Sequence, residues 1–414
     1  MYLPQYVKEV LSRLDSAGFE SYVVGGCVRN FLLGLPCADY DITTSAMPWE
    51  VKSALSPLPV FETGSHHGTV TALVQDKTVE ITTFREDSNY SDHRHPDSVR
   101  FSKDILCDLK RRDFTVNAMA YNEQQGLIDP YGGKKDLENN ILRCVGDCNL
   151  RFCEDALRIL RALRFSSQYG FCIEKETALS MLKNKELLHF VSKERILSEL
   201  KKIICGKKVE LVFSEFSEIL FLILPELKTL QNSRIGSPSL WELTLRYVNS
   251  LPDRFPLRFA ALFRFCGADI AKIRLKRLKS DRKTIAQVGL LLSNLPLKLQ
   301  NNRSEIKHLL SVLSPETLFE LILLEQTAPQ YFHLKTDEEL SDIRQTAEDI
   351  IKNGECFSLS SLAVNGNDLA SLGIHGKQTG AMLKALLTDV IEGSLPNERS
   401  ALLKCADEKK EKLP

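Results

Sequence analysis

The hydrophobic positions at the start of the chain follow a helical period and then give way to a short run typical of a strand. Val7, Val10 and Leu14 fall on one helical face, which predicts an opening helix that ends near Gly18. The apolar run of residues 22–24 predicts a strand directly after this helix.

Residues that favour strands return between positions 69 and 84. Residues 69–74 and 78–84 are rich in them and are separated by Gln75-Asp76-Lys77, so they predict an antiparallel hairpin. Residues 47–55 predict a further helix, with Pro48 suited to its first turn. The first third of the chain therefore mixes strands and helices.

Beyond about residue 143 the strand signals fade, and helical periods follow one another to the end of the chain. The clearest are residues 150–169, 174–182 and 193–204. We therefore expect an α+β protein, in which an N-terminal mixed α/β head with a small sheet precedes an all-helical remainder.

The composition indicates an ordinary soluble protein of two to four domains. The 414 residues include 54 basic and 54 acidic side chains, so the formal net charge is zero and any bound nucleic acid must meet a local basic surface. The start of the chain does not resemble a signal peptide, and the strongest apolar cluster, residues 219–224, is too short to span a membrane. Together with eleven scattered cysteines, this predicts a cytoplasmic protein without a membrane partner.

A glycine pair follows the first predicted strand. Gly25 and Gly26 stand where the helical period of Val28 and Phe31 begins, with Arg29 on the same short helix. Backbone N–H groups at a helix start favour an anion, and glycine lets a ligand approach the backbone closely. The segment predicts a phosphate site, with a simple turn as the alternative.

Two acids follow at strand spacing. Asp39 and Asp41 are separated by one residue, so in a strand both carboxylates point to the same face. Acids are uncommon in strands, and a hard divalent cation such as Mg²⁺ is the natural partner for two of them. Glu80 of the predicted hairpin is a candidate third carboxylate, with an edge-strand acid facing water as the alternative.

A dense polar segment occupies residues 111–118, and it predicts the start of a helix that includes Phe114. Asp113 would either cap this helix or accept a hydrogen bond from a ribose hydroxyl. In the second case Arg112 and Asn117 would brace Asp113 or the sugar.

The predicted helix of residues 150–169 carries a charged stripe. Asp155 lies three residues before Arg158, and Glu154 lies four before it, so these side chains share a face. An exposed ion pair is one interpretation. The other is base recognition, because cytosine and adenine both present an amine beside a ring-nitrogen acceptor, which a carboxylate and a guanidinium match without a nucleic-acid template.

These segments together resemble the ordered motifs of class II tRNA nucleotidyltransferases, the CCA-adding enzymes of the polymerase-beta-like nucleotidyltransferase superfamily. The resemblance covers about the first half of the chain, and the second half is similar in organisation only. The motifs are Gly25-Gly26-x-Val28-Arg29, Asp39-x-Asp41, Arg111-Arg112-Asp113-Phe114-Thr115-x-Asn117-Ala118, Glu154-Asp155-x-x-Arg158 and Ser192-Lys193-Glu194-Arg195-Ile196.

The resemblance implies a role for each motif residue. Two Mg²⁺ ions would bind Asp39 and Asp41. Glu80, which the strand pattern and not the resemblance suggests, would be the further catalytic acid. The triphosphate would meet Gly25, Gly26 and Arg29, the ribose Arg112, Asp113 and Asn117, and the base Asp155 and Arg158, with Arg161 also at the nucleotide. Glu154, Glu194 and Arg195 would support the base site. Asn30 stands where the family usually has an acid, which puts an ion-pair brace in doubt.

The resemblance also implies four parts: a nucleotidyltransferase head (1–143), a helical neck with the base-selecting helix (144–207), a helical body (208–330) and a helical tail that binds tRNA (331–414). We expect RNA contact from a basic window in the helical half, with a solvated helix face as the alternative. This window holds Lys272, Arg274, Lys276, Arg277, Lys279, Arg282 and Lys283.

The reaction implied is template-independent addition of C, C and A to the 3′ end of tRNA from CTP and ATP, with release of pyrophosphate and no DNA partner. A-only addition and a bacterial-type poly(A) polymerase are the enzymatic alternatives. A silent tRNA-binding protein on the same scaffold is a third. The polar segment 85–100 has no periodicity, which predicts a mobile loop. We further hypothesise that this loop enables the switch from adding C to adding A.

Overall fold

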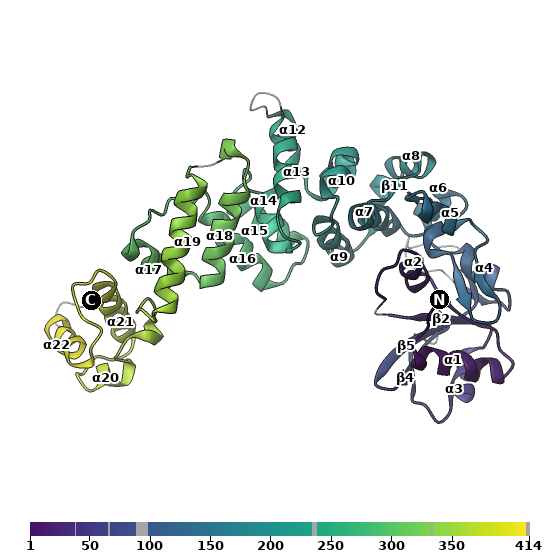
Figure 1. The fold of residues 1–414 in the computed structure, drawn as a ribbon, viewed down its shortest axis with the longest axis horizontal. Helices are drawn as coiled ribbons and strands as arrows, with labels where there is room; N and C mark the ends of the chain where they lie inside the picture. The colour runs from purple at the N-terminus through teal and green to yellow at the C-terminus, as the bar shows by residue number, and fades with distance from the viewer. Residues whose placement is uncertain (38, 65–66, 88–97, 234–237, 333, 411–414) are drawn as a thin grey trace. The chain divides into compact units, whose positions relative to one another are not determined.

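The computed structural model describes residues 1–37, 39–64, 67–87, 98–233, 238–332 and 334–410. The chain forms two compact units (Figure 1). The first unit is Met1–Pro225 with Arg277–Lys279, and the second is Glu226–Lys276 with Ser280–Pro414. The predicted division into four parts is finer than this, and it stays a prediction. Among the described helices, none is both long and apolar enough to cross a membrane.

A mixed seven-stranded sheet is the centre of the head, in the order β3-β4-β5-β2-β1-β8-β9. The pair β2 and β5 is parallel, and the other neighbours are antiparallel. The strands are β1 (Ser21–Val24), β2 (Asp41–Thr44), β3 (Val60–Gly64), β4 (Thr69–Val74), β5 (Lys77–Thr83), β8 (Ala120–Asn122) and β9 (Gly126–Ile128).

The predicted hairpin is confirmed as β4 and β5. Its turn residues Gln75 and Asp76 both have positive φ, 51° and 60°, as a tight two-residue hairpin requires. The opening helix is also confirmed as α1 (Gln5–Ser16), which packs beside α3 (Pro48–Leu55).

The core of the head takes alternate residues from its strands. Tyr22 and Val24 of β1 pack with Phe84, and with Ile105 and Leu109 of α4 (Ile105–Lys110). Because side chains alternate across a strand, Tyr22 and Val24 lie on the same face of β1, and this face packs against α4. The face of β1 that carries Tyr22 and Val24 therefore lies in the core of the head.

Two segments of the head differ from the sequence-based expectation. The ends of the predicted loop 85–100 pair as antiparallel strands, β6 (Arg85–Asp87) and β7 (Val99–Phe101), while residues 88–97 lie outside the described residues. The helix predicted from residue 113 is wrong. It is the short 3-10 turn η2 (Thr115–Asn117) followed by β8, because Ala120 and Tyr121 pair with β1 instead of continuing a helix.

The single helix predicted over residues 150–169 is also wrong. It is divided into α6 (Cys148–Glu154) and α7 (Leu157–Tyr169), because Asp155 between them is extended, with φ −143° and ψ 102°. The neck is not wholly helical either, since β10 (Ile141–Leu142) pairs in parallel with β11 (Cys172–Ile173). The remaining elements of the first unit are α2 (Gly26–Leu32), α5 (Gly133–Glu138), α8 (Lys175–Lys183), η3 (Lys185–Phe190), α9 (Lys193–Ile204), α10 (Val209–Glu215) and α11 (Ser217–Ile223), with η4 (Pro225–Leu227) at the boundary.

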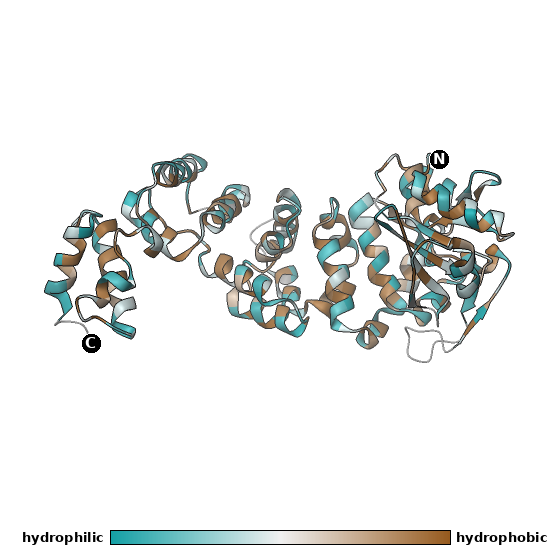
Figure 2. Ribbon diagram, turned by 90° about the horizontal axis from the view of Figure 1, so that it is seen from below, coloured by the Kyte–Doolittle hydropathy of each residue, from teal (hydrophilic) through white to brown (hydrophobic). Residues whose placement is uncertain are grey.

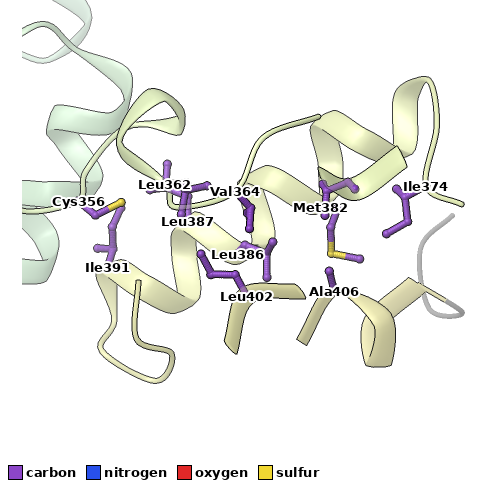
Figure 3. Packing of buried hydrophobic residues seen from close by; sticks show 11 residues of the cluster. Cys356, Leu362, Val364, Ile374, Met382, Leu386, Leu387, Ile391, Leu402 and Ala406 are labelled. Atoms are coloured by element: carbon purple, nitrogen blue, oxygen red, sulfur yellow. The ribbon is translucent and has the colours of Figure 1, made fainter. Parts of the chain in front are cut away.

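The second unit is helical in all its described elements, and many of its helices are hydrophobic along one side only (Figure 2). At its end, Met382 and Leu386 of α21 pack with Leu402 and Ala406 of α22 in one cluster (Figure 3). The elements are α12 (Lys228–Asn232), α13 (Leu240–Ser250), α14 (Phe255–Leu262), α15 (Ala268–Arg277), α16 (Arg282–Ser293), α17 (Arg303–Val312), α18 (Pro315–Thr327), η5 (Gln330–Phe332), α19 (Asp337–Lys352), η6 (Leu359–Ser361), α20 (Gly366–Ala370), α21 (Lys377–Ile391) and α22 (Arg399–Lys409).

Candidate active site

A polar pocket of about 420 Å³ lies within the first unit, and it gathers three of the predicted motifs. Its walls come from the turn between β1 and α2, the start of β2, the segment before η2, and helices α7 and α9. The lining residues are Gly25, Gly26, Arg29, Asp41, Arg112, Asp113, Asn117, Arg161, Arg164, Phe165, Gln168, Tyr169 and Lys202.

The glycine turn is set by the close passage of an arginine. Gly25 has φ +76°, and a Cβ atom there would lie 3.0 Å from Nη1 of Arg112. The Gly25 N–H donates to the carbonyl of Met119, 3.2 Å away, which ties the turn to the segment before β8. The positive φ therefore favours glycine at this position, and a Cβ atom there would also require the guanidinium of Arg112 to shift.

Arg29 is a buried cation held by neutral groups. Its guanidinium is stacked on the rings of Phe165 and Tyr169, with centroids 5.0 and 4.8 Å away, and only 7% of the residue is exposed. It donates to Oδ1 of Asn117 (2.6 Å), to Oδ1 of Asn30 (2.9 Å) and to the Tyr169 hydroxyl (3.1 Å). Burial lowers its pKa, and an anionic ligand would supply the charge that these neutral partners do not.

Asn30 therefore replaces the acid that the family usually has with neutral hydrogen bonds. Its Oδ1 accepts from both Nε and Nη2 of Arg29. The brace of the arginine is kept at this position, but without an ion pair.

Asp113 is fixed by a buried network and does not cap a helix. One carboxylate oxygen accepts from the Phe114 N–H (2.9 Å) and from Nδ2 of Asn117 (3.0 Å), and the other accepts from Nε of Arg161 (2.7 Å). Burial by itself would raise the pKa of Asp113, but Arg161 and Asn117 hold it well below the usual range. Asp113 is thus a charged acceptor at neutral pH.

Asp108 anchors the arginine pair before this network. It is fully buried, and it accepts from Nη2 of Arg111 (2.7 Å) and from Nη2 of Arg112 (3.1 Å). Although burial would raise the pKa of Asp108, the two guanidinium groups lower it. Its role was not predicted, because nothing local in the sequence shows that Asp108 faces inward.

The acids predicted to hold a metal lie on or next to two neighbouring inner strands of the sheet, β2 and β5. Asp41 begins β2 and is paired side by side with Glu80 of the parallel strand β5, so both carboxylates lie on the same face. Asp39 precedes the strand, so its placement by strand alternation was wrong. The pKa of Asp41 is raised by loss of water, then by the Glu80 carboxylate, and also by Asp39, while Arg112 opposes these effects.

A carboxylate whose pKa is raised by burial and by neighbouring acids favours a bound cation, and carboxylate oxygens are suitable ligands for a hard one. Within the described ranges, however, no three His, Cys, Asp or Glu side chains converge as a ready-made metal cluster. The donor chemistry at Asp41 and Glu80 fits a divalent cation, and the full ligand set stays a prediction.

Asp155 and Arg158 do not form the pair that the helical spacing predicted, and neither lines the pocket. Asp155 accepts from Nη2 of Arg195 (2.8 Å), whereas Arg158 donates to Glu154 (2.7 Å) and to the carbonyl of Arg111 (3.1 Å). The helix break at Asp155 separates the two side chains. Glu154 and Arg195 each brace one of them.

Glu194 does not contact these groups. Its carboxylate accepts from Nζ of Lys279 at 2.7 Å, and both side chains are largely exposed. Among the residues that the structure describes, no contact links the Glu194 side chain to Asp155 or Arg158, so its predicted support of the base site stays a prediction.

Helices α7 and α9 contribute pocket residues that sequence reasoning missed, namely Arg164, Phe165, Gln168, Tyr169 and Lys202. Arg164 is buried and pairs with Glu199 of α9 at 3.0 Å. The spacing of Arg158, Arg161 and Arg164 at three-residue intervals was the available signal.

The basic window of the helical half is partly neutralised. Arg274 pairs with Glu226 at 2.6 Å and Lys272 with Asp269 at 3.4 Å. Four further cations of the window are exposed and have no ion pair with any residue that the structure describes. They are Lys276, Arg277, Arg282 and Lys283.

Comparison with protein families gives matches along most of the chain. Residues 21–143 match the Poly A polymerase head domain family, which ends where the predicted head ends. Residues 170–230 match a family described as a probable RNA- and SrmB-binding site of polymerase A, and residues 259–406 match domain 2 of tRNA nucleotidyltransferase.

Individual proteins resemble the chain over nearly its whole length. The CCA-adding enzyme of Limosilactobacillus fermentum is 36% identical, over 97% of this chain and 96% of the relative, and that of Enterococcus faecalis is 34% identical, over 99% and 98%. The crystal structure of the Bacillus stearothermophilus CCA-adding enzyme in complex with CTP is similar with a TM-score of 0.77 and 27% identity, covering 100% of this chain and 99% of that one. The chain belongs to the CCA-adding enzyme family of nucleotidyltransferases.

Proposed function

We propose that this chain adds C, C and A to the 3′ end of tRNA, using CTP and ATP without a template and releasing pyrophosphate. The observation that carries the proposal is the polarity of the pocket. It has carboxylates at one edge and, on another wall, the buried Arg29, whose hydrogen bonds end on neutral groups. Such a site matches a triphosphate that is accompanied by a cation.

The metal-binding part of the proposal assigns Mg²⁺ to Asp39 and Asp41, with Glu80 as the further acid. The nucleotidyltransferase family suggests divalent metal use in general. When bound, the ions would favour ionisation of the 3′-hydroxyl and neutralise the leaving pyrophosphate. The raised pKa of Asp41 supports this assignment, because burial and the Glu80 carboxylate disfavour the charged form, which a bound cation would stabilise.

The nucleotide part of the proposal assigns the triphosphate to Gly25, Gly26 and Arg29, beside Arg112. It assigns a ribose hydroxyl to Asp113, which stays ionised and is oriented by Asn117 and Arg161. An ionised acceptor in a fixed position favours a hydroxyl donor over a sugar that lacks one.

The base-selecting part of the proposal assigns Asp155 and Arg158 to the exocyclic amine and ring nitrogen of C and A. Their present partners, Arg195 and Glu154, would fix the direction of each group. A-only addition and poly(A) synthesis are not favoured, because the relatives that match the whole chain are CCA-adding enzymes. The cytoplasmic location stays an expectation from the sequence.

The deciding experiment uses the purified full chain with Mg²⁺, one tRNA that ends at the discriminator base and one that ends in CC. Each is offered CTP, ATP or both. We expect three additions to the first tRNA and one to the second. Addition of A alone to the second tRNA would mean an A-adding enzyme, and long A tails on unrelated RNA would mean a poly(A) polymerase.

The first prediction concerns the strand acid. Replacing Asp41 with Asn keeps its size but removes a negative ligand, so nucleotide addition should fall by about 100-fold or more while tRNA binding is retained. The rate is measured under saturating Mg²⁺, and Asp342→Asn on the exposed side of α19 serves as the control. A rate near that of the unaltered chain would contradict the metal assignment.

A further inference from the structure

The wall of the pocket formed by α7 and α9 contains a lysine that no motif assigns. Lys202 lies on α9, is exposed, and lines the same pocket as Gly25, Gly26 and Arg29. It lies in the last turn of α9 (Lys193–Ile204), so the backbone that carries its side chain is held in a regular helix.

Lys202 differs from the paired arginines of the pocket because no acid neutralises its charge among the residues that the structure describes. Three arginines of the pocket each have a carboxylate partner, whereas Arg29 is held by neutral groups. In the part of the chain that the structure describes, no hydrogen bond or ion pair holds Lys202. The three paired arginines are Arg112 with Asp108 at 3.1 Å, Arg161 with Asp113 at 2.5 Å and Arg164 with Glu199 at 3.0 Å.

The packing of α7 against α9 places Lys202 near the Arg29 end of the pocket. Arg164 contacts Glu199, and Ser167 donates to the carbonyl of Ile203 at 2.7 Å, so the two helices run in the same direction. One turn beyond the Arg164 contact, α7 reaches Tyr169, whose hydroxyl accepts from Arg29, and α9 reaches Lys202. The two uncompensated cations therefore share one end of the pocket.

We propose that Lys202 binds the terminal phosphates of the nucleoside triphosphate and the pyrophosphate that leaves, acting together with Arg29. This inference rests on the proposed function. During transfer the 3′-hydroxyl loses its proton to water and its oxygen forms a bond to the α-phosphorus. The bond from the α-phosphorus to the bridging oxygen breaks, and pyrophosphate leaves with the electron pair. Lys202 donates hydrogen bonds to the negative charge that develops on the pyrophosphate.

The test compares Lys202→Ala, Lys202→Arg and the control Lys193→Ala in the full chain. Lys193 is exposed at the start of the same helix and does not line the pocket. For Lys202→Ala we expect the KM for both CTP and ATP, and the KM for pyrophosphate in the reverse reaction, to rise about tenfold, as for loss of one charge-assisted hydrogen bond. Lys202→Arg should restore most of the difference, and Lys193→Ala should match the unaltered chain.

The KM for tRNA separates this role from others. It should stay unchanged in Lys202→Ala, because the lysine meets the nucleotide and not the primer. A rise in the tRNA KM with unchanged pyrophosphate parameters would overturn the proposal, and so would unchanged values for all substrates.

Titration calorimetry with inorganic pyrophosphate and Mg²⁺ tests Lys202 independently of turnover. We expect about tenfold weaker binding by Lys202→Ala than by the unaltered chain. If the chain binds pyrophosphate through Lys202 but does not extend tRNA, the proposed function fails and the phosphate site stands. If it extends tRNA and the affinity is unchanged in the variant, only the role of Lys202 fails.

Discussion

Asn117 connects two ionic groups of the pocket, Arg29 and Asp113, through one amide. Its carbonyl oxygen accepts from Arg29, and its NH₂ group donates to Asp113. An amide side chain supplies both an acceptor and a donor in this arrangement. An acid of the same size would lose the bond to Asp113, and a hydrophobic residue would lose both bonds. This one residue therefore couples the proposed phosphate and ribose sites.

The Asp113–Arg161 pair gives a prediction for stability. Replacing Arg161 with Met leaves Asp113 buried without its cation, which should lower the free energy of unfolding at pH 7 by about 2 kcal/mol, a low value for a buried pair because Arg161 is partly exposed. Urea unfolding of both chains measures this difference. Arg344→Met, which breaks the exposed pair with Glu348, is the control and should change stability by less than about 0.5 kcal/mol.

The pH dependence of that difference has a definite sign. In the unaltered chain the pKa of Asp113 is lowered, so its contribution is present above the unfolded pKa of about 3.9 and is lost only as pH falls through the lower folded value. Without Arg161, burial should raise the folded pKa, and the charged carboxylate then destabilises the fold as pH rises. The difference between the two chains should be larger at pH 7 than at pH 4.5. A difference that is independent of pH would contradict this account.

At the scale of elements, the break between α6 and α7 determines the directions of Asp155 and Arg158, the groups proposed to select the base. The Asp155 carboxylate accepts from the Leu157 N–H at 3.0 Å, and Arg195 of α9 holds the same carboxylate. The local sequence favours one continuous helix, because Glu, Ala, Leu and Arg are all good helix formers. The break depends on a partner 40 residues away, which hydrophobic periodicity does not reveal.

This gives a prediction for substrate choice. Arg195→Ala frees Asp155 without touching the pocket wall, so discrimination between CTP and UTP should fall about tenfold while the rate with CTP changes less. The ratio of kcat/KM for the two nucleotides, measured in competition, tests this. Lys193→Ala on the same helix should keep the ratio of the unaltered chain. If Arg195→Ala discriminated between CTP and UTP as well as the unaltered chain, the proposed role of Asp155 in base selection would be contradicted.

The elements that sequence analysis located are those with local signals. Helix α9 has the predicted bounds, Lys193–Ile204, because its apolar residues keep a helical period, and the β4–β5 hairpin follows from its β-rich strands. The glycine turn at Gly25 and the pairing of Asp113 with Asn117 also lie inside single motifs. The positions of these elements and residues can therefore be predicted from short stretches of sequence.

Other pocket residues depend on contacts between distant segments. Asp108, Arg164 and Lys202 acquire their positions from packing between elements, and their own neighbours in sequence contain only ordinary helical patterns. The first residue of β2, Asp41, could not be predicted from the local sequence either, because the pairing of β2 with β1 and β5 determines where the strand begins. Sequence motifs therefore predict the chemical groups of the site better than they predict which other residues line the pocket.

At the scale of the whole molecule, charge restricts where RNA can bind. The formal net charge is zero, so long-range attraction to a polyanion is weak and affinity must come from local cations. The basic window from Lys272 to Lys283 is less basic than its sequence indicates, because some of its members are paired with acids. The exposed cations Arg282 and Lys283 at the start of α16 are the strongest candidates for phosphate contact.

Replacing both Arg282 and Lys283 with Ala should weaken tRNA binding at low salt and reduce its salt dependence. Each lost phosphate contact should lower the slope of log affinity against log salt by about 0.7 to 0.9, because fewer counterions are released on binding. Affinity is measured by filter binding between low and physiological salt, and Arg344→Ala on α19 is the charge-matched control for one position. The rate at saturating tRNA should be unchanged, since neither side chain lines the pocket. An unaltered slope in the double variant would mean that this face is solvated and that tRNA is bound elsewhere.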